Sequence, residues 1–224
     1  SISKEFNAVG IMMLKEQGKL NPDDKISKFL PDLPAWAATI SIKNLLQYTS
    51  GLPDIKWNTI KSDADILNDM KQIQTLMFEP GSNYAYNNSN VFLQRRIIEK
   101  IAGMPFHTFV ETYLLKPCGM NASVVDPARE DKNIAVSFNN DRLESARQFN
   151  YVMTGWTAVT ARDLYQWTQC LHSFRIINRE SFREILIPAF VNKQSGLGGG
   201  SMDGNTIKEH LHHGSSADFE SLMY

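Results

Sequence analysis

The sequence is poor in cysteine and has no excess of charge of either sign. Only Cys118 and Cys170 occur among its 224 residues, which is too few to predict a disulfide framework or a redox compartment. The 23 basic residues nearly balance the 24 acidic ones, leaving a formal net charge of −1 and no visible Lys/Arg cluster. Because binding to nucleic acid or to an anionic membrane needs clustered positive charge, the composition argues against both.

Long hydrophobic runs, internal repeats and low-complexity segments are also missing. No apolar run approaches the roughly 18 residues of a membrane helix, so the sequence predicts no membrane span. No initiator Met and no signal-peptide pattern precede Ser1, and we expect that processing or truncation removed the original start. A hydrophobic fraction of 42% over 224 residues is nevertheless enough to bury a core in one large or two small domains.

Helical periodicity dominates the chain, and strand patterns occur only near its end. Helices are predicted, in chain order, over residues 1–18, 42–48, 62–77, 93–103, 105–114, 160–171 and 178–186. Residues 121–153 show no clear periodicity and are predicted to be rich in loops. Two short strands around a turn are predicted over 206–212 and 219–224, after a glycine-rich segment. This order of elements predicts an α/β (α+β) chain.

Ser1 and Lys4 form an S-x-x-K pattern at the start of the first predicted helix. Residues three apart share a helix face, so the Lys4 amine can lie beside the Ser1 hydroxyl and withdraw its proton if burial lowers the lysine pKa. The alternative is a surface serine and lysine, because about one S-x-x-K is expected by chance in a chain of this length.

Tyr86 and Asn88 lie between a Pro-Gly loop and the helix predicted at 93–103. A phenol at such a junction can shuttle a proton, and the Asn88 amide can donate to a substrate carbonyl or orient the lysine. The alternative is that Tyr86 is a packed aromatic residue whose hydroxyl has a structural partner.

His212, His213 and Gly214 stand at the end of a predicted strand, just before Ser215. A glycine here lets a substrate backbone approach the strand edge, and an imidazole can contact a carboxylate or a leaving group. His210 and His212 would share one strand face, as zinc ligands could. No carboxylate or cysteine stands nearby at ligand spacing, so we predict no metal.

Two other kinds of serine hydrolase fit the sequence less well. The G-x-S-x-G pattern of a nucleophile elbow does not occur. An N-terminal-nucleophile hydrolase would use the Ser1 α-amino group as its base, but it needs its nucleophile at the end of a strand, whereas Ser1 opens a predicted helix.

The S-x-x-K, Y-x-N and H-x-G patterns each occur once, in that order along the chain. Together with the stretches 17–24, 48–53, 79–88 and 160–164, they resemble the serine β-lactamase and penicillin-binding-protein superfamily. The resemblance is greatest to the branch of class C β-lactamases, D-Ala-D-Ala carboxypeptidases, D-aminopeptidases and related esterases, and it covers nearly the whole chain.

This resemblance implies a β-lactamase/transpeptidase-like fold, in which an antiparallel sheet flanked by helices adjoins a mostly helical region. Residues 1–18 would form the nucleophile-bearing helix between the two regions, and residues 19–153 would form the helical region. Residues 154–224 would supply helices and strands of the α/β region. In the family, strands precede the nucleophile and others follow the third motif, so we expect the sheet to be incomplete in this chain.

The resemblance also implies a role for each residue of the first two motifs. Ser1 would be the acylated nucleophile and Lys4 its base partner. Tyr86 would relay the proton to the leaving group, and Asn88 would hold the substrate and the lysine. Which group acts as the base within the family is disputed, and the residues leave both possibilities open.

In the third motif, His212 stands where the family has Lys or His, and Gly214 closes the motif. The backbone N–H groups of Ser1 and Ser215 would form the oxyanion hole. A histidine is charged only part of the time near neutral pH, which favours a peptidase or esterase over a true β-lactamase. Asp218 stands where the family usually has glycine, which would add a carboxylate near the cleft entrance; the alternative is that Asp218 only caps a turn.

The implied function is that of a serine hydrolase that cleaves an amide or ester through a covalent acyl-enzyme, with a D-amino-acid peptide or ester as a candidate substrate. The alternative is a module on the same fold that binds penicillin or peptidoglycan peptide without turnover; a third possibility is a stable fragment with neither activity. No cofactor is implied, the expected partner is a small-molecule or peptide substrate, and the resemblance implies export to the periplasm or cell envelope. The oligomeric state is not predicted.

Overall fold

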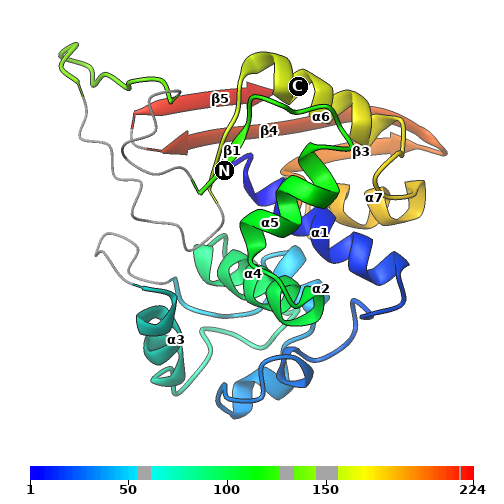
Figure 1. Ribbon diagram of the computed structural model, residues 1–224. Helices are drawn as coiled ribbons and strands as arrows, with labels where there is room; N and C mark the ends of the chain where they lie inside the picture. Colours follow the sequence, from blue (N-terminus) through cyan, green and yellow to red (C-terminus); the bar gives the residue numbers. More distant parts are fainter. Residues whose placement is uncertain (55–61, 127–133, 145–155, 217) are drawn as a thin grey trace.

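The computed structural model describes residues 1–54, 62–126, 134–144, 156–216 and 218–224 (Figure 1). The helices are α1 (Lys4–Glu16), α2 (Ile42–Leu46), α3 (Asp63–Lys71), α4 (Asn88–Ala102), α5 (Phe106–Val110), α6 (Ala161–His172) and α7 (Arg179–Leu186). The single helical turns are η1 (Ile26–Lys28), η2 (Ala35–Ala38) and η3 (Glu111–Leu115). The strands are β1 (Val124–Val125), β2 (Thr157–Ala158), β3 (Gly199–Asp203), β4 (Thr206–Ser216) and β5 (Phe219–Met223).

The strands β3, β4 and β5 form an antiparallel sheet in that order, and β1 pairs separately with β2. Along β4 the buried side chains of His210 and His212 alternate with the exposed side chains of Leu211 and His213. We call the buried side the inner face of the sheet. In Figure 1 the sheet lies at the top, with α1 and α7 below it and α6 in front. The alternation follows from the strand period of two, which sends successive side chains to opposite faces.

The remaining helices form the lower, mostly helical region, in which α4 contacts α1, α2 and α5 (Figure 1). One cluster of buried hydrophobic residues joins the two regions, and it includes Phe6 of α1, Phe92 of α4 and Trp167 of α6. These aromatic side chains are fully buried, so each removes a large apolar area from water. The cluster contains residues from all three predicted segments, 1–18, 19–153 and 154–224, so the core is shared by the three segments.

Several boundaries differ from the sequence predictions. The helix predicted over 62–77 ends at Lys71, and the strand predicted to end at His212 continues to Ser216. Thr160 and Asp163 have the spacing of a capping box, and Thr160 caps α6 by accepting a hydrogen bond from the Asp163 N–H at 3.1 Å. The Asp163 carboxylate does not complete the capping box, because it accepts hydrogen bonds from the Ala122 N–H and the Ser123 hydroxyl.

Cys118 and Cys170 form a disulfide, with their Cα atoms 5.5 Å apart. The bond joins the segment after η3 to helix α6, and both cysteines are buried. The cysteine count alone did not predict this pairing, because two cysteines 52 positions apart carry no recognisable spacing. The disulfide fixes the helical region to the region that carries the sheet.

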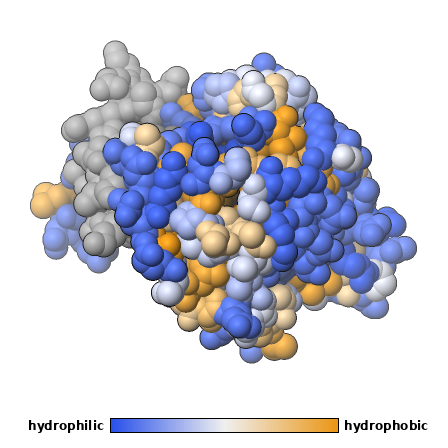
Figure 2. Space-filling model, turned by 90° about the horizontal axis from the view of Figure 1, so that it is seen from below, coloured by the Kyte–Doolittle hydropathy of each residue, from blue (hydrophilic) through white to orange (hydrophobic). Residues whose placement is uncertain are grey.

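The face opposite the sheet, which Figure 2 shows, is mostly hydrophilic, with smaller hydrophobic areas between the polar side chains. Within the described ranges, no helix has the length and apolar character needed to cross a membrane.

Candidate active site

Ser1, Lys4 and Tyr86 meet at the N-terminal end of α1. The Ser1 Oγ atom lies 3.1 Å from Lys4 Nζ and 2.8 Å from the Tyr86 hydroxyl. The ammonium of Lys4, a buried residue, also lies 5.2 Å from the centre of the Tyr86 ring. Both neighbours of the Ser1 hydroxyl can therefore give or receive a proton at the same oxygen atom.

Helix geometry places the first two of these side chains together. The Lys4 N–H donates to the Ser1 carbonyl at 2.9 Å, so the chain is already turning helically between the two residues. Ser3 fixes this end of the helix by accepting a hydrogen bond from the Thr157 N–H of β2 at 3.0 Å. Ser1 thus lies at the positive end of the α1 dipole, where developing negative charge is stabilised.

The loop before α4 positions Tyr86 through its backbone neighbours. Asn87 is the N-cap of α4, and its side chain also donates to the Leu52 carbonyl at 2.7 Å. The Ala85 N–H donates to the Tyr48 carbonyl at 2.9 Å. These bonds hold both flanks of Tyr86 against the 48–53 segment, so the position of the phenol depends on that segment.

Tyr48 and Gly51 give the 48–53 segment its shape. Both have left-handed backbone angles, with φ of 55° at Tyr48 and 75° at Gly51. A Cβ atom on Gly51 would overlap the Phe78 carbonyl oxygen, so only glycine fits there. The buried Tyr48 ring lies 4.8 Å from the Tyr86 ring. Burial, together with the nearby Tyr86, raises the pKa of Tyr48 well above 10, which keeps its hydroxyl neutral.

Gly214 brings strand β4 against the nucleophile end of α1. A Cβ atom at this position would lie 2.6 Å from the Ser1 nitrogen and 3.1 Å from the Ile2 nitrogen. The two backbones therefore approach more closely than any other residue would allow. Ser215, the next residue along β4, lines a cavity together with Ser1.

The structure places His212 and His213 differently from the sequence prediction. His212 points to the inner face of the sheet and is 1% exposed, and its Nδ1 lies 2.8 Å from Glu5 Oε1. His213, which stands between His212 and Gly214 of the third motif, lines the cavity with Ser1. The imidazole that lines this cavity is that of His213.

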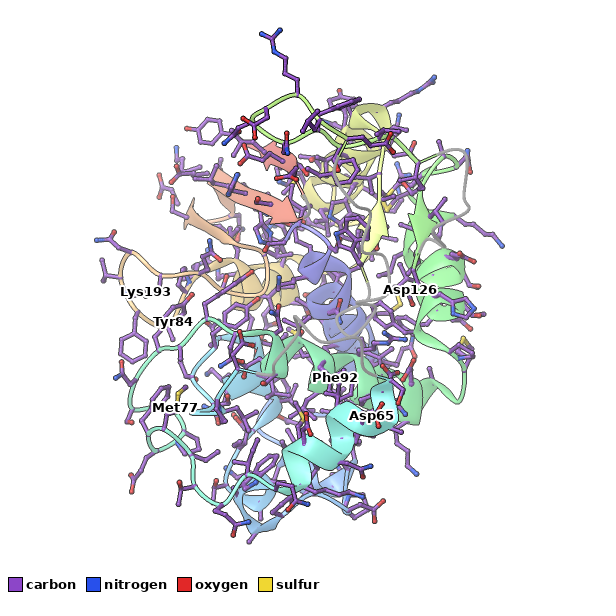
Figure 3. All side chains as sticks on the ribbon, turned by 90° about the vertical axis from the view of Figure 1, so that its left-hand side faces the viewer. Asp65, Met77, Tyr84, Phe92, Asp126 and Lys193 are labelled. Atoms are coloured by element: carbon purple, nitrogen blue, oxygen red, sulfur yellow. A yellow bond between two sulfur atoms is a disulfide. The ribbon has the colours of Figure 1, made fainter. Side chains whose placement is uncertain are left out.

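A cavity of about 430 Å³ opens beside Ser1. Its lining residues are Ser1, Tyr84, Tyr86, Asn192, Lys193, Gln194, His213 and Ser215. No carboxylate is among them, and Lys193 supplies a positive charge, with its Nζ atom 5.5 Å from the Tyr84 ring. Figure 3 shows Tyr84 and Lys193 as neighbours at one edge of the molecule. The lining suits a neutral or anionic ligand better than a cationic one.

Asn88 and Asp218 do not join this group. The Asn88 backbone N–H donates to the Asp54 carboxylate at 2.8 Å, and within the described part of the chain its side-chain amide makes no hydrogen bond to Lys4 or Ser1. Asp218 occupies the turn between β4 and β5 with a φ of 62°, a conformation that Asp tolerates better than most residues. In the ranges that the structure describes, no three His, Cys, Asp or Glu side chains are placed to hold a metal ion.

Glu5 and Lys193 were not predicted as residues of the site. Glu5 follows Lys4 directly and lies one helical turn after Ser1, a spacing that could have drawn attention to it. Lys193 belongs to an exposed loop without a motif, and nothing in the sequence marks it.

Comparisons with known proteins identify relatives of most of the chain. A family model described as Beta-lactamase matches residues 1–207. Penicillin-binding protein 4* of Bacillus subtilis (strain 168) is 31% identical over 221 residues, which cover 86% of this chain and 48% of that protein. The chain likewise covers 49% of the putative penicillin-binding protein PbpX of the same strain, so it spans about half the length of these curated relatives.

Solved structures show the same fold. The crystal structure of a penicillin-binding protein from Bacillus halodurans matches with a TM-score of 0.82 at 23% identity, covering 100% of this chain and 76% of that one. A D-stereospecific amidohydrolase from Streptomyces matches with a TM-score of 0.76 at 20% identity, covering 99% and 76% of the two chains. The predicted β-lactamase/transpeptidase-like fold is confirmed. Because the family model matches residues 1–207, the chain belongs to the beta-lactamase family.

Proposed function

We propose that this chain carries the catalytic centre of a serine hydrolase that cleaves an amide or ester through a covalent acyl-enzyme. The observation that carries the proposal is the position of Ser1 Oγ, within hydrogen-bond distance of both Lys4 Nζ and the Tyr86 hydroxyl. A nucleophile with two proton-transfer groups and a helix N-terminus beside it has what acyl transfer requires.

In the proposed reaction, the Ser1 hydroxyl loses its proton to the neutral amine form of Lys4 as Oγ attacks the substrate carbonyl carbon. The oxyanion forms near the N-terminus of α1, where the backbone N–H groups of Ser1 and Ser215 are the candidate donors. The leaving group departs with a proton delivered by Tyr86, the proton that Lys4 received passes on to Tyr86, and Ser1 is left as an ester. Water then hydrolyses this ester, releasing the acid and restoring the Ser1 hydroxyl.

The lining of the cavity supports a substrate with a neutral or negatively charged group near the scissile bond. Lys193 and His213 can both face such a group, and no carboxylate lines the cavity to repel it. A D-amino-acid peptide or ester with a free carboxylate meets this description. The name of the Streptomyces relative, a D-stereospecific amidohydrolase, supports the same substrate class.

We also propose that the protein acts outside the cytoplasm, in the periplasm or cell envelope. The disulfide between Cys118 and Cys170 supports this location, because such bonds persist mainly in oxidising compartments.

The test is to treat the purified protein with a fluorescent penicillin or fluorophosphonate and to locate the adduct by mass spectrometry. We expect the label on Ser1, with hydrolysis of p-nitrophenyl esters or nitrocefin. Lys4→Ala should lose the label, whereas Lys15→Ala should keep it, because Lys15 lies on the same helix but pairs with Glu184.

Absence of both adduct and turnover would count against the hydrolase. A stoichiometric adduct that is never released would instead favour the alternative function, a penicillin- or peptide-binding sensor without turnover.

A further inference from the structure

Glu5 is a fully buried carboxylate that contacts three side chains far away in the sequence. Its Oε2 accepts a hydrogen bond from the Trp167 indole N–H at 2.7 Å. Its Oε1 lies 2.8 Å from His212 Nδ1 and 3.3 Å from His210 Nε2. An ionised carboxylate with no exposure to water needs such partners, because burial without them costs several kcal/mol. The contacts join α1 to β4 and α6 at one point.

The contact between Glu5 and His212 lies close to Ser1 along both α1 and β4. Ser1 and Glu5 are four residues apart, about 6 Å along a helix axis. Gly214 and His212 are two residues apart, about 7 Å along a strand. Because Gly214 touches the Ser1 backbone and His212 touches Glu5, α1 and β4 lie against each other at two successive contacts.

The His212 ring depends on Glu5 for its orientation. His212 is 1% exposed, and its Nε2 is buried with no hydrogen-bond partner in the described ranges. Its bond to Glu5 is therefore the polar contact that fixes the ring. When Nδ1 donates to the carboxylate, the tautomer of the ring is fixed as well.

The charges around Glu5 favour its ionised form. Burial alone would raise its pKa, but the charge and hydrogen bonds of His210 and His212 lower it to about 2. Burial lowers the pKa of His210, yet Glu5 raises it above 6.5 overall. Among the described residues, three other titratable groups interact with this cluster. They are His172 of α6, whose Nε2 lies 3.0 Å from His210 Nδ1, the Ser1 amino group, and Tyr48, which follows α2.

We propose that Glu5 is a positioning residue of the active site, which holds His212 and with it strand β4 in register against α1, so that Gly214 and Ser215 stay beside Ser1. The inference rests on the proposed hydrolase function. Glu5 does not reach the cavity, so it acts through β4 and not on the substrate. Misplacement of the Ser215 N–H by about 1 Å is the kind of error that costs on the order of 10²-fold in rate.

The main test is Glu5→Gln, which keeps the shape of the side chain but removes its charge. We expect kcat for a p-nitrophenyl ester to fall by about 10²-fold, with KM within about 3-fold of wild type and unchanged circular dichroism. NMR should show His210 titrating at lower pH in the variant, because the carboxylate that raises its pKa is gone.

Trp167→Phe is the matched control. It removes the hydrogen bond to the other oxygen of the same carboxylate and leaves both histidine contacts in place. We expect its kcat to stay within about 3-fold of wild type. A folded Glu5→Gln variant with wild-type kcat would overturn the proposal, as would an equal loss in the two variants.

Two further measurements decide the question if the main variant fails to fold or if the wild type proves inactive. In the first case, His212→Asn keeps a donor at the Nδ1 position and should retain at least about ten times the kcat of His212→Ala; equal values would overturn the proposal. In the second case the hydrolase function fails, and amide exchange at Gly214 and Ser215 tests the register alone. We then expect faster exchange in Glu5→Gln than in wild type, and equal rates would refute the positioning role.

Discussion

Two tyrosines line the cavity, but only one is in contact with the nucleophile. The Tyr86 hydroxyl lies 2.8 Å from Ser1 Oγ, whereas the Tyr84 hydroxyl accepts a hydrogen bond from the Gln194 N–H at 3.3 Å. Partial burial raises the pKa of Tyr84, so it stays protonated and neutral. The two residues carry the same phenol group, but only the Tyr86 hydroxyl lies within hydrogen-bond distance of Ser1 Oγ.

Tyr86→Phe should slow acylation of Ser1 by about 10²-fold or more, because a positioned proton-transfer group contributes on the order of 10²–10⁴-fold. Tyr84→Phe, which removes the same oxygen atom from the same cavity, should cost less than about 10-fold. The rate of label incorporation from a fluorescent penicillin measures both. A loss of less than about 10-fold in both variants would contradict the role of the Tyr86 hydroxyl and leave Tyr86 only the packing of its ring.

A second residue-scale prediction concerns Asp126, which lies far from the cavity lining (Figure 3). Burial raises its pKa to about 7, against the opposing effect of Arg95, whose guanidinium lies 3.6 Å away. The folded state therefore binds this proton more tightly than the unfolded chain, where the pKa is near 3.8. The free energy of unfolding should fall as the pH rises from about 4 to about 7 and then level off.

Asp126→Asn should remove this part of the pH dependence, so its stability relative to wild type should rise between pH 4.5 and pH 8. Asn also tolerates the left-handed backbone at this position, where φ is 53°. Urea denaturation at the two pH values is the measurement, and Asp32→Asn at an exposed position controls for the loss of one negative charge. A constant difference between wild type and Asp126→Asn would contradict the prediction.

At the scale of elements, the 48–53 segment is the support on which Tyr86 rests. Its Gly51 has both a left-handed φ and no space for a Cβ atom beside the Phe78 carbonyl. Gly18, which follows α1, has a similar φ of 69° but open space around it. Comparing alanine substitutions at Gly51 and Gly18 therefore separates the effect of backbone strain from the effect of a steric clash.

Gly18→Ala should lower the free energy of unfolding by about 1–2 kcal/mol, the cost of a left-handed alanine. Gly51→Ala should cost about 1–3 kcal/mol more, because the added methyl group displaces its neighbours. It should also slow acylation, since Tyr86 moves with the segment. Denaturant unfolding and Ser1 labelling test both effects, and equal stability of the two variants would contradict the clash.

Local signals predicted the elements better than their ends. The helix predicted over 42–48 is present as α2, and Ser41, a residue type favoured at helix N-caps, caps it in a complete capping box with Asn44. Helix α3 ends at Lys71 although apolar residues continue at helical spacing to Met77. The Met77 N–H donates to the Gly51 carbonyl at 2.7 Å, a tertiary contact that the helical period does not reveal. Strand β4 is longer than predicted because its last residues pair with β5, and pairing between strands is invisible to a local pattern.

At the scale of the whole molecule, the disulfide closes a loop of 52 positions between the helical region and α6. In the chain-entropy account, a loop of this length contributes on the order of 4 kcal/mol. The double variant Cys118→Ala/Cys170→Ala should therefore unfold at lower urea concentration, with a loss of about 2–4 kcal/mol. Dithiothreitol should lower the stability of the wild type similarly and leave that of the variant unchanged. Equal stability of the oxidised wild type and the variant would contradict this role.

The separation in sequence between two contacting residues explains which parts of the site could be predicted. Ser1 and Lys4 are helix neighbours, so their contact follows from a spacing of three. Tyr86 and Gly214 could be placed only by resemblance of their motifs to a family. The bond between Glu5 and His212 spans 207 positions, and neither its partners nor the inward turn of His212 follows from local periodicity.

The close approach of Gly214 to Ser1 has a consequence for the order in which the protein can mature. Ser1 precedes Gly214 of β4 by more than 200 positions, so its surroundings are complete only after β4 has been made and has docked. Contacts between such distant positions form late, because closing a long loop costs entropy before any contact compensates for it. In a nascent or partly folded chain, Ser1 is therefore exposed and not yet in contact with β4. Acquisition of reactivity towards an acylating probe would then report the final docking of that strand, and the nucleophile would serve as a built-in indicator of completed folding.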